Sequence, residues 1–280
     1  MNIEIAIKNA CKELKENKIS SPLLDSELLL SKVIKKDRKF ILLNPDKELN
    51  QIDQKNFKDL IIRRSKGKPL AYLTGSKSFW KYDFKVNEKV LIPRPDTEII
   101  IEQILDIYKN KSNLNFLDVG IGSGCIALSI LKEKKSFFAT GVDLSRDCIN
   151  ICTYNANKLG VSNRIKLLKS DVDNLNFRKY DLIISNPPYI KKLDLKKLNR
   201  EVINYEPKLA LDGGLEGLSV IRKVIKKSSE LVKTHGKLIL EIGYDQKELV
   251  KKILKENNFY VNKTFKDLAK NDRCIISTKK

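Results

Sequence analysis

Residues 118–124 read Asp-Val-Gly-Ile-Gly-Ser-Gly, and this stretch decides the fold. The apolar run at 116–119 predicts a buried strand before the glycines, and residues 125–132 have the pattern of a helix after them. Glycine allows the backbone to turn tightly and to approach a ligand closely. The stretch therefore predicts a strand, a ligand-binding loop and a helix in direct succession.

The alternation of strand and helix continues through the rest of the chain. Helical stretches separate most of the further β-rich apolar runs, which lie at residues 137–142, 165–168, 182–184, 238–242 and 274–276. Strands that alternate with helices form a parallel sheet with helices on both faces. We therefore expect a Rossmann-like α/β fold with a doubly wound, mostly parallel sheet.

The glycine loop and one acidic residue together indicate the kind of ligand. The spacing is G-x-G-x-G rather than the dinucleotide pattern G-x-G-x-x-G, which disfavours a pyrophosphate ligand. Asp143 stands at the end of the next predicted strand, 23 residues after Gly120. A carboxylate at that place can accept hydrogen bonds from both hydroxyls of a ribose, so the sequence predicts a nucleoside site.

A second polar cluster, Asn186-Pro187-Pro188-Tyr189, follows the strand predicted at 181–185. Two consecutive prolines remove two backbone donors and stiffen the turn. The groups that remain are acceptors, namely the Asn186 side-chain oxygen and the Pro187 carbonyl, and Tyr189 adds an aromatic face. Such a site suits a planar group that carries an NH2 to donate.

The first 75 residues predict a small helical domain. Apolar residues at 3, 7, 10 and 14 recur at helical spacing. Ser21 followed by Pro22 predicts the start of a second helix, with the Ser hydroxyl as its cap. Asn50 predicts the cap of a third helix that ends near Gly67. These apolar stripes indicate a hydrophobic core, and the pattern points to no catalytic or binding residues in this domain.

Residues 76–98 predict a hairpin that links the helical domain to an α/β domain at 99–280. Apolar and polar residues alternate from 79 to 90, with Asn87 near a turn. Two prolines then fix the backbone, and Asp96 or Thr97 can cap the helix predicted at 99–108.

The cysteines and the single histidine limit the kinds of site. The five cysteines form no C-x-x-C pair, and His235 is the only histidine. We therefore expect neither a metal site nor a disulfide framework. We interpret Cys148 and Cys152 as plain helix residues and His235, which precedes a glycine, as a loop residue.

The net charge of +20 raises the question of a nucleic-acid partner. Lys supplies 45 of the 55 basic residues and Arg only 10, and the charge is spread along the chain. Arg is the preferred residue for bidentate contacts to phosphates and bases, so we do not expect direct nucleic-acid binding. No stretch resembles a membrane helix or a signal peptide, and no heptad pattern occurs. We expect a cytoplasmic monomer without a membrane partner.

Taken together, the motifs resemble those of the release-factor glutamine methyltransferases, the family called PrmC or HemK. The resemblance covers essentially the whole chain. Its specific marks are residues 69–75, the pair Phe79-Trp80, residues 91–98, residues 185–190, Glu206-Pro207 with Ala210-Leu211, and residues 240–243.

The resemblance implies a methyl transfer from S-adenosylmethionine to the glutamine of a Gly-Gly-Gln motif in peptide-chain release factors. By the resemblance, the residues that bind the cofactor are Gly120, Ile121, Gly122, Ser123, Gly124, Asp143, Val172 and Asn186. Those that bind the glutamine are Asn186, Pro187, Pro188 and Tyr189, and the catalytic ones among them are Asn186, Pro187 and Tyr189. The resemblance also implies that the helical domain at 1–75 docks the substrate.

Two other functions remain open at this point. A DNA or RNA methyltransferase that acts on the amino nitrogen of adenine or cytosine faces the same chemical problem with a similar motif. Against it, the chain after residue 115 leaves no room for a target-recognition domain. The other alternative is a basic RNA-binding or ribosome-binding module without catalysis, which the intact glycine loop, acid and Asn-Pro-Pro-Tyr disfavour.

Overall fold

The computed structural model of the chain describes residues 1–176 and 179–280 and divides into two compact units. The helical unit consists of residues 1–76 together with 199–205, and the sheet unit consists of residues 77–198 and 206–280. Among the described residues, none of the helices combines the length and the apolar character needed to cross a membrane.

The helical unit packs around one apolar core, as the spacing of its apolar residues predicts. Its helices are α1 (Ile3–Glu16), α2 (Pro22–Ile34), α3 (Arg38–Leu43), α4 (Gln51–Ser65), α5 (Leu70–Thr74) and α9 (Arg200–Tyr205). The predicted Asn50 cap is confirmed, because its side chain accepts from the backbone N–H of Asp53 at 2.8 Å. The predicted helix start at Ser21-Pro22 is confirmed, but the predicted cap by the Ser21 hydroxyl is wrong, because that side chain makes no cap hydrogen bond. The Ser21 hydroxyl instead donates to the Asp25 carboxylate at 2.8 Å, so that carboxylate competes successfully for it.

Arg64 joins three segments inside the helical unit. Its guanidinium is 2.6 Å from the Asp25 carboxylate on α2 and 2.8 Å from Glu201 on α9, and it donates to the Lys68 carbonyl at 3.0 Å. A buried guanidinium requires such partners, since an unpaired charge in the core is costly. The ion pair to Glu201 explains why a short segment far along the sequence belongs to this unit.

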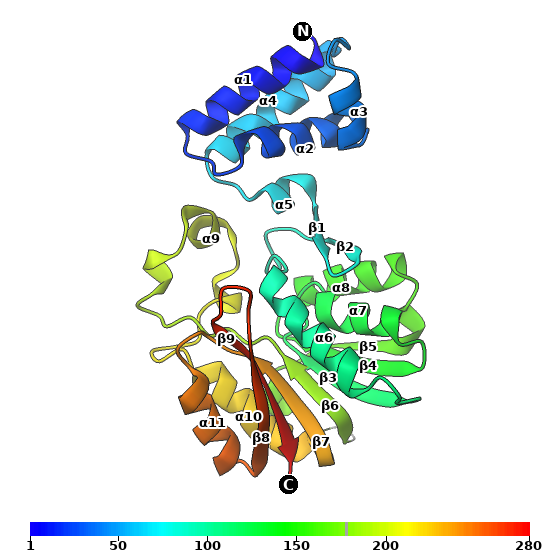
Figure 1. Cartoon of the computed structure of the whole chain (residues 1–280), viewed down its shortest axis with the longest axis vertical. Coiled ribbons are helices and arrows are strands. Elements are labelled where there is room, and N and C mark those ends of the chain that lie inside the picture. The colour runs from blue at the N-terminus through cyan, green and yellow to red at the C-terminus, as the bar shows by residue number, and fades with distance from the viewer. Residues whose placement is uncertain (177–178) are drawn as a thin grey trace. The chain divides into compact units, whose positions relative to one another are not determined.

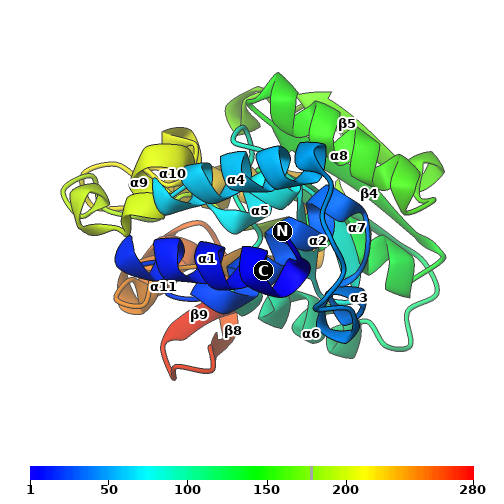
Figure 2. The ribbon, with the colours of Figure 1, turned by 90° about the horizontal axis from the view of Figure 1, so that it is seen from above.

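The sheet unit contains a seven-stranded sheet in the order β5-β4-β3-β6-β7-β9-β8 (Figure 1). The strands are β3 (Leu114–Val119), β4 (Phe137–Asp143), β5 (Ile165–Lys169), β6 (Tyr180–Ser185), β7 (Val232–Glu241), β8 (Phe259–Lys266) and β9 (Asp272–Lys279). The first five pair in parallel, and β9 runs antiparallel to both β7 and β8. The predicted mostly parallel sheet is therefore confirmed. Figure 2 shows β5 and β8 at opposite ends of it.

Helices cover both faces of this sheet (Figure 1). One core lies beneath α6 (Glu98–Ile107), α7 (Cys125–Glu133) and α8 (Arg146–Lys158), and the other beneath α10 (Ser219–Leu231) and α11 (Lys247–Glu256). Neighbouring residues of β3 divide between the cores, since Phe116 faces the first and Leu117 the second. Burial on both faces is the reason that the parallel strands read as continuous apolar runs.

Two features of the sheet differ from the sequence prediction. Strand β8 was not predicted; it is an edge strand, and its exposed side chains make the sequence look polar. His235 was predicted in a loop, but it lies within β7 at φ 64°. Its place is a register shift, because Tyr180 pairs with Val232 while Leu182 already pairs with Lys237. Extra residues in one strand of a pair bend it locally, which accommodates this backbone conformation.

The predicted hairpin is present as a two-stranded sheet, β1 (Ser76–Phe79) and β2 (Tyr82–Lys85). The predicted turn at Asn87 is confirmed as well, since the Asn87 carbonyl accepts from the backbone N–H of Val90 at 3.1 Å. The side chain of Asn155 on α8 holds β2 in place. It accepts from the Lys85 N–H at 2.8 Å and donates to the Lys85 carbonyl at 3.1 Å and to the Ser123 carbonyl at 2.9 Å. One buried amide thus links the hairpin, α8 and the glycine loop.

Replacing this amide tests how much the link stabilises the sheet unit. Asn155→Ala leaves backbone groups of Lys85 and Ser123 without their partner, and unmade buried hydrogen bonds are costly. We expect the free energy of unfolding to fall by about 2–3 kcal/mol, measured by urea denaturation. Asn157→Ala, an exposed Asn on the same helix, is the control and should change it little. Equal effects of the two substitutions would contradict the proposed link.

Candidate functional site

The predicted site residues gather at one edge of the sheet. Val119 at the end of β3 pairs with Val142 on β4 and with Ser185 on β6, and Asp143 pairs with Lys169 on β5. The strands are parallel and in register, so the residues that follow them emerge side by side. The glycine loop, Asp143, the segment before Val172 and Asn186 therefore share this edge.

The glycine loop adopts backbone conformations that favour glycine. Gly120, Gly122 and Gly124 have φ of 77°, 54° and 83°. A side chain at Gly124 would also lie 2.6 Å from the Cys152 Sγ, so this glycine is needed for packing between loop and helix. A side chain at Gly120 or Gly122 would meet nothing within 4 Å. These two positions border open space, which is the space a ligand close to the backbone would use.

The Asp143 carboxylate holds the glycine loop. Its Oδ2 accepts from the backbone N–H of Gly122 and its Oδ1 from that of Ser145, both at 2.9 Å. An ionised carboxylate has about four acceptor positions, so two remain for a ligand. The structure therefore shows a role in the loop itself, beside the predicted role toward a ribose.

Two other loop residues direct their side chains inward. Ile121 is buried in the core, where its Cδ1 fills the space beside Gly141. Ser123 is buried as well, and its carbonyl accepts the hydrogen bond from Asn155. Contacts of these two residues with a ligand would therefore come from their backbone.

Asp118 begins the stretch at 118–124, and the sequence prediction gave it no role. Its carboxyl is fully buried below the loop and receives a hydrogen bond from the Ala127 backbone. Its Oδ2 has no hydrogen-bond partner among the described residues. Burial raises the pKa of Asp118 to about 7, and the negative charge of Asp143 adds to the shift. A buried carboxyl with a free oxygen favours a donor or a cation nearby.

Val172 begins the short helix η3 (Val172–Asn174), just after β5. It is buried against the core that contains Leu117 and Val142. The Ser170 N–H donates to the Asp143 carbonyl at 3.0 Å, which brings this segment alongside the end of β4. The segment is therefore close to Asp143, as its predicted place in the cofactor site requires.

The Asn-Pro-Pro-Tyr segment leaves β6 next to the glycine loop. The Ser185 hydroxyl donates to the Val119 carbonyl at 2.8 Å, which ties the ends of β6 and β3 together. Pro187 is buried, while Asn186 and Tyr189 are half-buried. The Tyr189 carbonyl accepts from the Gln246 side chain at 2.9 Å, which fixes the far end of the turn.

A chain of hydrogen bonds orients the Asn186 and Tyr189 side chains. The Asn186 Nδ2 donates to the Thr97 hydroxyl at 3.2 Å, and that hydroxyl donates to Glu241 Oε2 at 2.6 Å. The Tyr189 hydroxyl donates to Glu241 Oε1 at 3.1 Å and accepts from Arg273 at 3.4 Å. The predicted cap on α6 is therefore wrong for Thr97, because its hydroxyl is engaged by Glu241.

Burial raises the pKa of both acids that these hydrogen bonds join, Tyr189 and Glu241. It raises the pKa of Tyr189, and the nearby Glu241 raises it further, so the phenol stays protonated. The pKa of Glu241 is raised on balance by burial, against the hydrogen bond from Thr97, the charge of Arg273 and the hydrogen bond from Tyr189, which favour its ionised form. Two hydroxyl donors on its two oxygens are the pattern of an ionised carboxylate.

Sequence reasoning missed the roles of Thr97, Glu241 and Arg273. Thr97 and Glu241 lie in stretches that mark the family resemblance, 91–98 and 240–243, so a signal existed for them. Arg273 carried no such signal. It reaches the site because β9 pairs with β7, which places Cys274 opposite Glu241.

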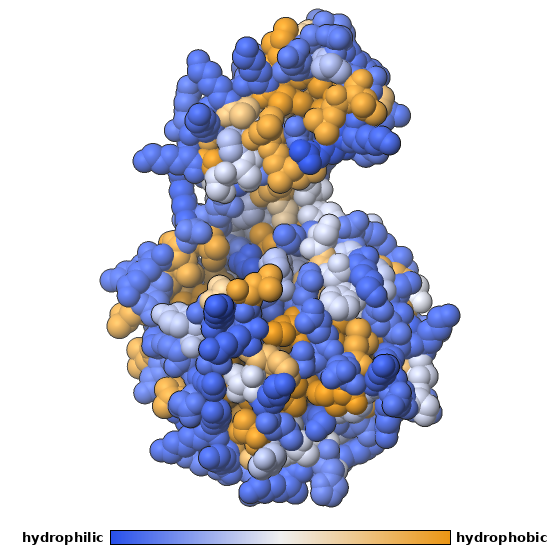
Figure 3. Space-filling view, in the orientation of Figure 1, coloured by the Kyte–Doolittle hydropathy of each residue, from blue (hydrophilic) through white to orange (hydrophobic). Residues whose placement is uncertain are grey.

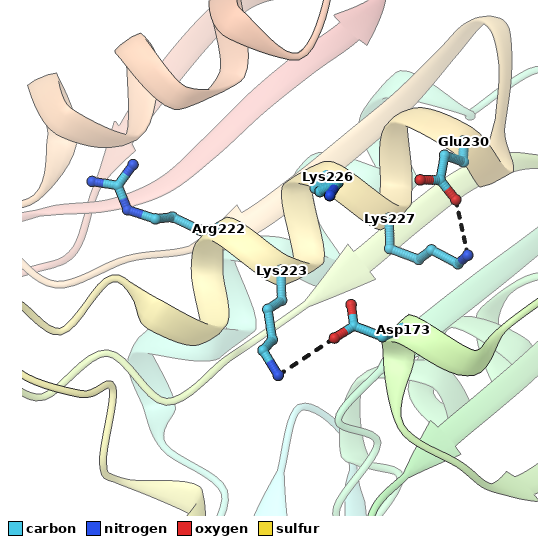
Figure 4. Close-up of a pocket in the computed structure, with 6 residues that line it drawn as sticks. All are labelled: Asp173, Arg222, Lys223, Lys226, Lys227 and Glu230. Carbon is cyan, nitrogen blue, oxygen red and sulfur yellow. Dashed lines mark hydrogen bonds and ion pairs between the residues drawn. The ribbon is translucent and has the colours of Figure 1, made fainter.

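A cavity of 410 Å³ lies elsewhere in the sheet unit, along α10 (Figure 4). Most of its charges are paired, because Lys223 lies 3.4 Å from Asp173 and Lys227 lies 2.8 Å from Glu230. None of the predicted site residues lines it. The predicted site therefore lies at the sheet edge and not in this cavity.

Known proteins show similarity to both units. The family model described as the PrmC N-terminal domain matches residues 6–75, and the methyltransferase small domain model matches residues 96–237. The release factor glutamine methyltransferase of Fusobacterium nucleatum is 38% identical over 99% of this chain and 79% of its own. That of Clostridium acetobutylicum is 36% identical over 100% and 99%. The chain spans 57% of the bifunctional methyltransferase of Rickettsia conorii, to which it is 34% identical.

Solved structures share the fold at lower sequence identity. A methyltransferase from Pyrococcus furiosus is 18% identical, covers 80% of this chain and 98% of its own, and has a TM-score of 0.53. A ribosomal protein L11 methylase from Lactobacillus delbrueckii is also 18% identical, covers 68% and 82%, and has a TM-score of 0.52. These structures support the Rossmann-like methyltransferase fold.

The raised pKa of Asp118 predicts a dependence of stability on pH. The folded chain holds a proton up to about pH 7 that the unfolded chain releases near pH 4. The contribution of Asp118 to stability therefore falls as pH rises from about 4 to about 7 and then stays constant. Asp118→Asn keeps an acceptor for the Ala127 N–H and removes the buried charge.

We expect this variant to gain on the order of 2 kcal/mol over the parent between pH 5 and pH 8. Urea denaturation at both pH values measures the gain. Asp147→Asn, an exposed Asp in the same unit, is the control. A constant difference between Asp118→Asn and the parent across this range would show that Asp118 does not titrate there.

Proposed function

This chain is a methyltransferase that belongs to the release factor glutamine methyltransferase family, and we propose that it methylates the glutamine side-chain amide in the Gly-Gly-Gln motif of peptide-chain release factors. The methyl donor we propose is S-adenosylmethionine. The observation that carries the proposal is the arrangement at one sheet edge of the glycine loop, two acids and the oriented Asn186 amide.

The charges around the glycine loop favour this cofactor over a dinucleotide. Asp143 holds the loop with acceptor positions to spare, and Asp118 lies below it with a free buried oxygen. The negative charge of Asp143 disfavours a pyrophosphate and favours a ligand that carries positive charge, as S-adenosylmethionine does. The open space beside Gly120 and Gly122 lets such a ligand approach the backbone. In this proposal Asp143 also accepts from the ribose and Val172 packs near the adenine.

The Asn-Pro-Pro-Tyr segment is proposed to hold the amide that is methylated. An amide nitrogen is a poor nucleophile because its lone pair is delocalised into the carbonyl. Asn186 Oδ1 and the Pro187 carbonyl can accept its two N–H groups and fix its orientation. They also stabilise the positive charge that develops on nitrogen. Pro188 and Tyr189 complete the pocket around the flat amide.

S-adenosylmethionine supplies an electrophilic methyl group on a sulfonium when bound. The contribution of the chain is to hold the acceptor nitrogen in line with that methyl group, at about 3–3.5 Å. The stiff prolines restrict the acceptor, and exclusion of water strengthens its hydrogen bonds. No general base is required before the transfer begins. The nitrogen would gain its bond to the methyl carbon as the sulfonium bond to that carbon breaks, and it would then lose one of its two protons to solvent.

The helical unit is proposed to dock the release factor. Apolar side chains reach its surface (Figure 3), and the exposed ones include Leu42 and Leu43 on α3. Leu43 is 68% exposed. Exposed apolar side chains that lie together are typical of surfaces that bind another protein. Contacts remote from the reacting amide can bring it into place.

A specific observation keeps the nucleic-acid methyltransferase as an alternative. A groove of 590 Å³ along α11 and β8 is rich in lysine, with Tyr260 exposed among them. The lysines are Lys247, Lys251, Lys255, Lys263 and Lys280. Lysine-rich grooves attract phosphate backbones, although two of these lysines are paired with acids.

The cofactor proposal is tested by ligand binding. S-adenosylmethionine should raise the melting temperature, and NAD should not. Asp143→Ala should weaken binding at least about tenfold in calorimetry, because charge-assisted hydrogen bonds to the ligand and to the loop are lost. Asp147→Ala, an exposed acid four residues away, should bind as the parent does. Full affinity in Asp143→Ala would remove Asp143 from the site.

The substrate proposal is tested by offering labelled S-adenosylmethionine with four acceptors in parallel: an intact release factor, a Gly-Gly-Gln peptide, tRNA and duplex DNA. We expect label on the release factor, little on the peptide and none on nucleic acid. Asn186→Ala should lower turnover by about 10²–10³-fold, as for loss of one preorganised polar partner. Label on nucleic acid alone would establish the alternative.

A surface variant separates docking from chemistry in the same assay. Replacing both Leu42 and Leu43 by Ser should raise the KM for the release factor and leave labelling of the peptide unchanged. Leu249→Ser, an exposed leucine on α11, is the matched control. A KM that does not move would argue against docking through α3.

A further inference from the structure

We propose that Thr97 and Glu241 are positioning residues that fix which end of the Asn186 amide faces the acceptor nitrogen. This inference deepens the proposed function and rests on it. The amide of Asn186 has a donor end and an acceptor end of almost equal size, and only the acceptor end suits a substrate that offers N–H. A device that distinguishes the two ends is therefore needed for transfer.

Arg273 fixes the direction of the hydrogen bonds at Tyr189. Its guanidinium donates only, and it is held by the Asp267 carboxylate at 2.9 Å. Because Arg273 donates to the Tyr189 hydroxyl, that hydroxyl accepts there and directs its own proton to Glu241 Oε1. Because the hydroxyl accepts from Arg273, its own hydrogen bond to the next group can run in only one direction.

The same logic continues from Glu241 to Asn186. An ionised Glu241 can only accept hydrogen bonds. The Thr97 hydroxyl must therefore donate its single proton to Glu241 Oε2, at 2.6 Å. Thr97 Oγ can then only accept from Asn186, which turns the Nδ2 toward Thr97. Asn186 Oδ1 is left for the substrate. The Glu241 carboxylate, which is not proposed to contact the substrate, thus determines which atom donates in the two hydrogen bonds of Thr97.

The neighbours of Asn186 in sequence cannot supply this orientation. Pro187 and Pro188 carry no backbone N–H that could donate to the Asn186 oxygen. The acceptor that holds the Asn186 Nδ2 is the Thr97 hydroxyl, from 89 residues earlier, and Glu241 at the end of β7 accepts from that hydroxyl. The orientation is therefore a property of the folded sheet unit.

The substitution Glu241→Gln should reverse the direction of the hydrogen bonds at Thr97, while the side chain at 241 keeps its shape. The Tyr189 proton still needs an acceptor, so the new amide oxygen faces Tyr189 and its NH2 faces Thr97. Thr97 then accepts from residue 241 and donates to Asn186, which turns the Asn186 oxygen away from the substrate. We expect kcat to fall about 10²-fold with cofactor affinity unchanged.

A second substitution should restore activity to the Glu241→Gln variant, in which the hydrogen bonds at Thr97 are reversed. In Glu241→Gln combined with Asn186→Asp, Thr97 donates to one carboxylate oxygen, and the other oxygen accepts from the substrate. Asn186→Asp alone should be poor, because the single Thr97 proton cannot serve two carboxylates. We expect the double variant to turn over at least about tenfold faster than either single variant.

The experiment measures kcat and KM on the release factor for five variants and the parent. The variants are Thr97→Val, Thr97→Ser, Glu241→Gln, Asn186→Asp and the double variant. Thr97→Ser keeps the hydroxyl and should stay within about threefold of the parent, whereas Thr97→Val should lose kcat. Melting temperatures and cofactor calorimetry identify any variant that fails to fold.

A readout without substrate accompanies the kinetics. In protein labelled with ¹⁵N-Asn, one side-chain amide proton of Asn186 should be protected from exchange, with its signal identified by its loss in Asn186→Asp. This protection should disappear in Glu241→Gln and Thr97→Val and persist in Thr97→Ser. The NMR result holds whether or not the release factor is the substrate.

The outcomes separate the inference from the proposed function. If the parent does not label the release factor, the proposed function fails, while the amide signals still decide the orientation of Asn186. Unchanged protection in Glu241→Gln would overturn the inference. A kcat in Glu241→Gln within about threefold of an active parent, or a double variant no faster than its single variants, would overturn it too.

Discussion

The parallel pairing of β3 with β4 on one side and β6 on the other is the constraint on which the site depends. Because Val119 pairs with both Val142 and Ser185, the segments that follow β3, β4 and β6 leave the sheet at the same level. A one-residue slip would reverse which side chains face each core and would move the loops apart. Different side chains fill the two cores, with Phe116 in one and Leu117 in the other, and a slip would exchange them. Packing in the cores therefore positions the polar groups at the edge.

The sequence predicted what is local and missed what depends on pairing. The glycine loop, Asp143 and Asn-Pro-Pro-Tyr could be placed at one edge because each follows an apolar run. Strand β8 was missed because an edge strand shows polar residues. The register shift at His235 depends on the partner strand. The Ser21 and Thr97 hydroxyls were taken for caps, since a nearby carboxylate that competes for a hydroxyl is not visible in a local pattern.

The charge distribution of the sheet edge differs from that of the whole chain. The net charge is +20, yet the buried or half-buried groups around the glycine loop and the turn include Asp118, Asp143 and Glu241. Burial strengthens electrostatic interactions because water no longer screens them. A ligand at this edge therefore meets nearby negative charge more strongly than the distant surface lysines, whose fields are screened by salt. The local acids, not the net charge, indicate the kind of ligand.

The rigid turn after β6 explains why the site needs residues from so many elements. Two prolines fix the backbone of the turn but remove the donors that could have oriented Asn186. The molecule therefore orients that amide from outside the turn, through Thr97 before α6 and Glu241 at the end of β7. Arg273 on β9 donates to the Tyr189 hydroxyl, which in turn donates to the other oxygen of Glu241. The antiparallel strand β9 is thus connected to the turn after β6 through the hydrogen bond from Arg273 to Tyr189.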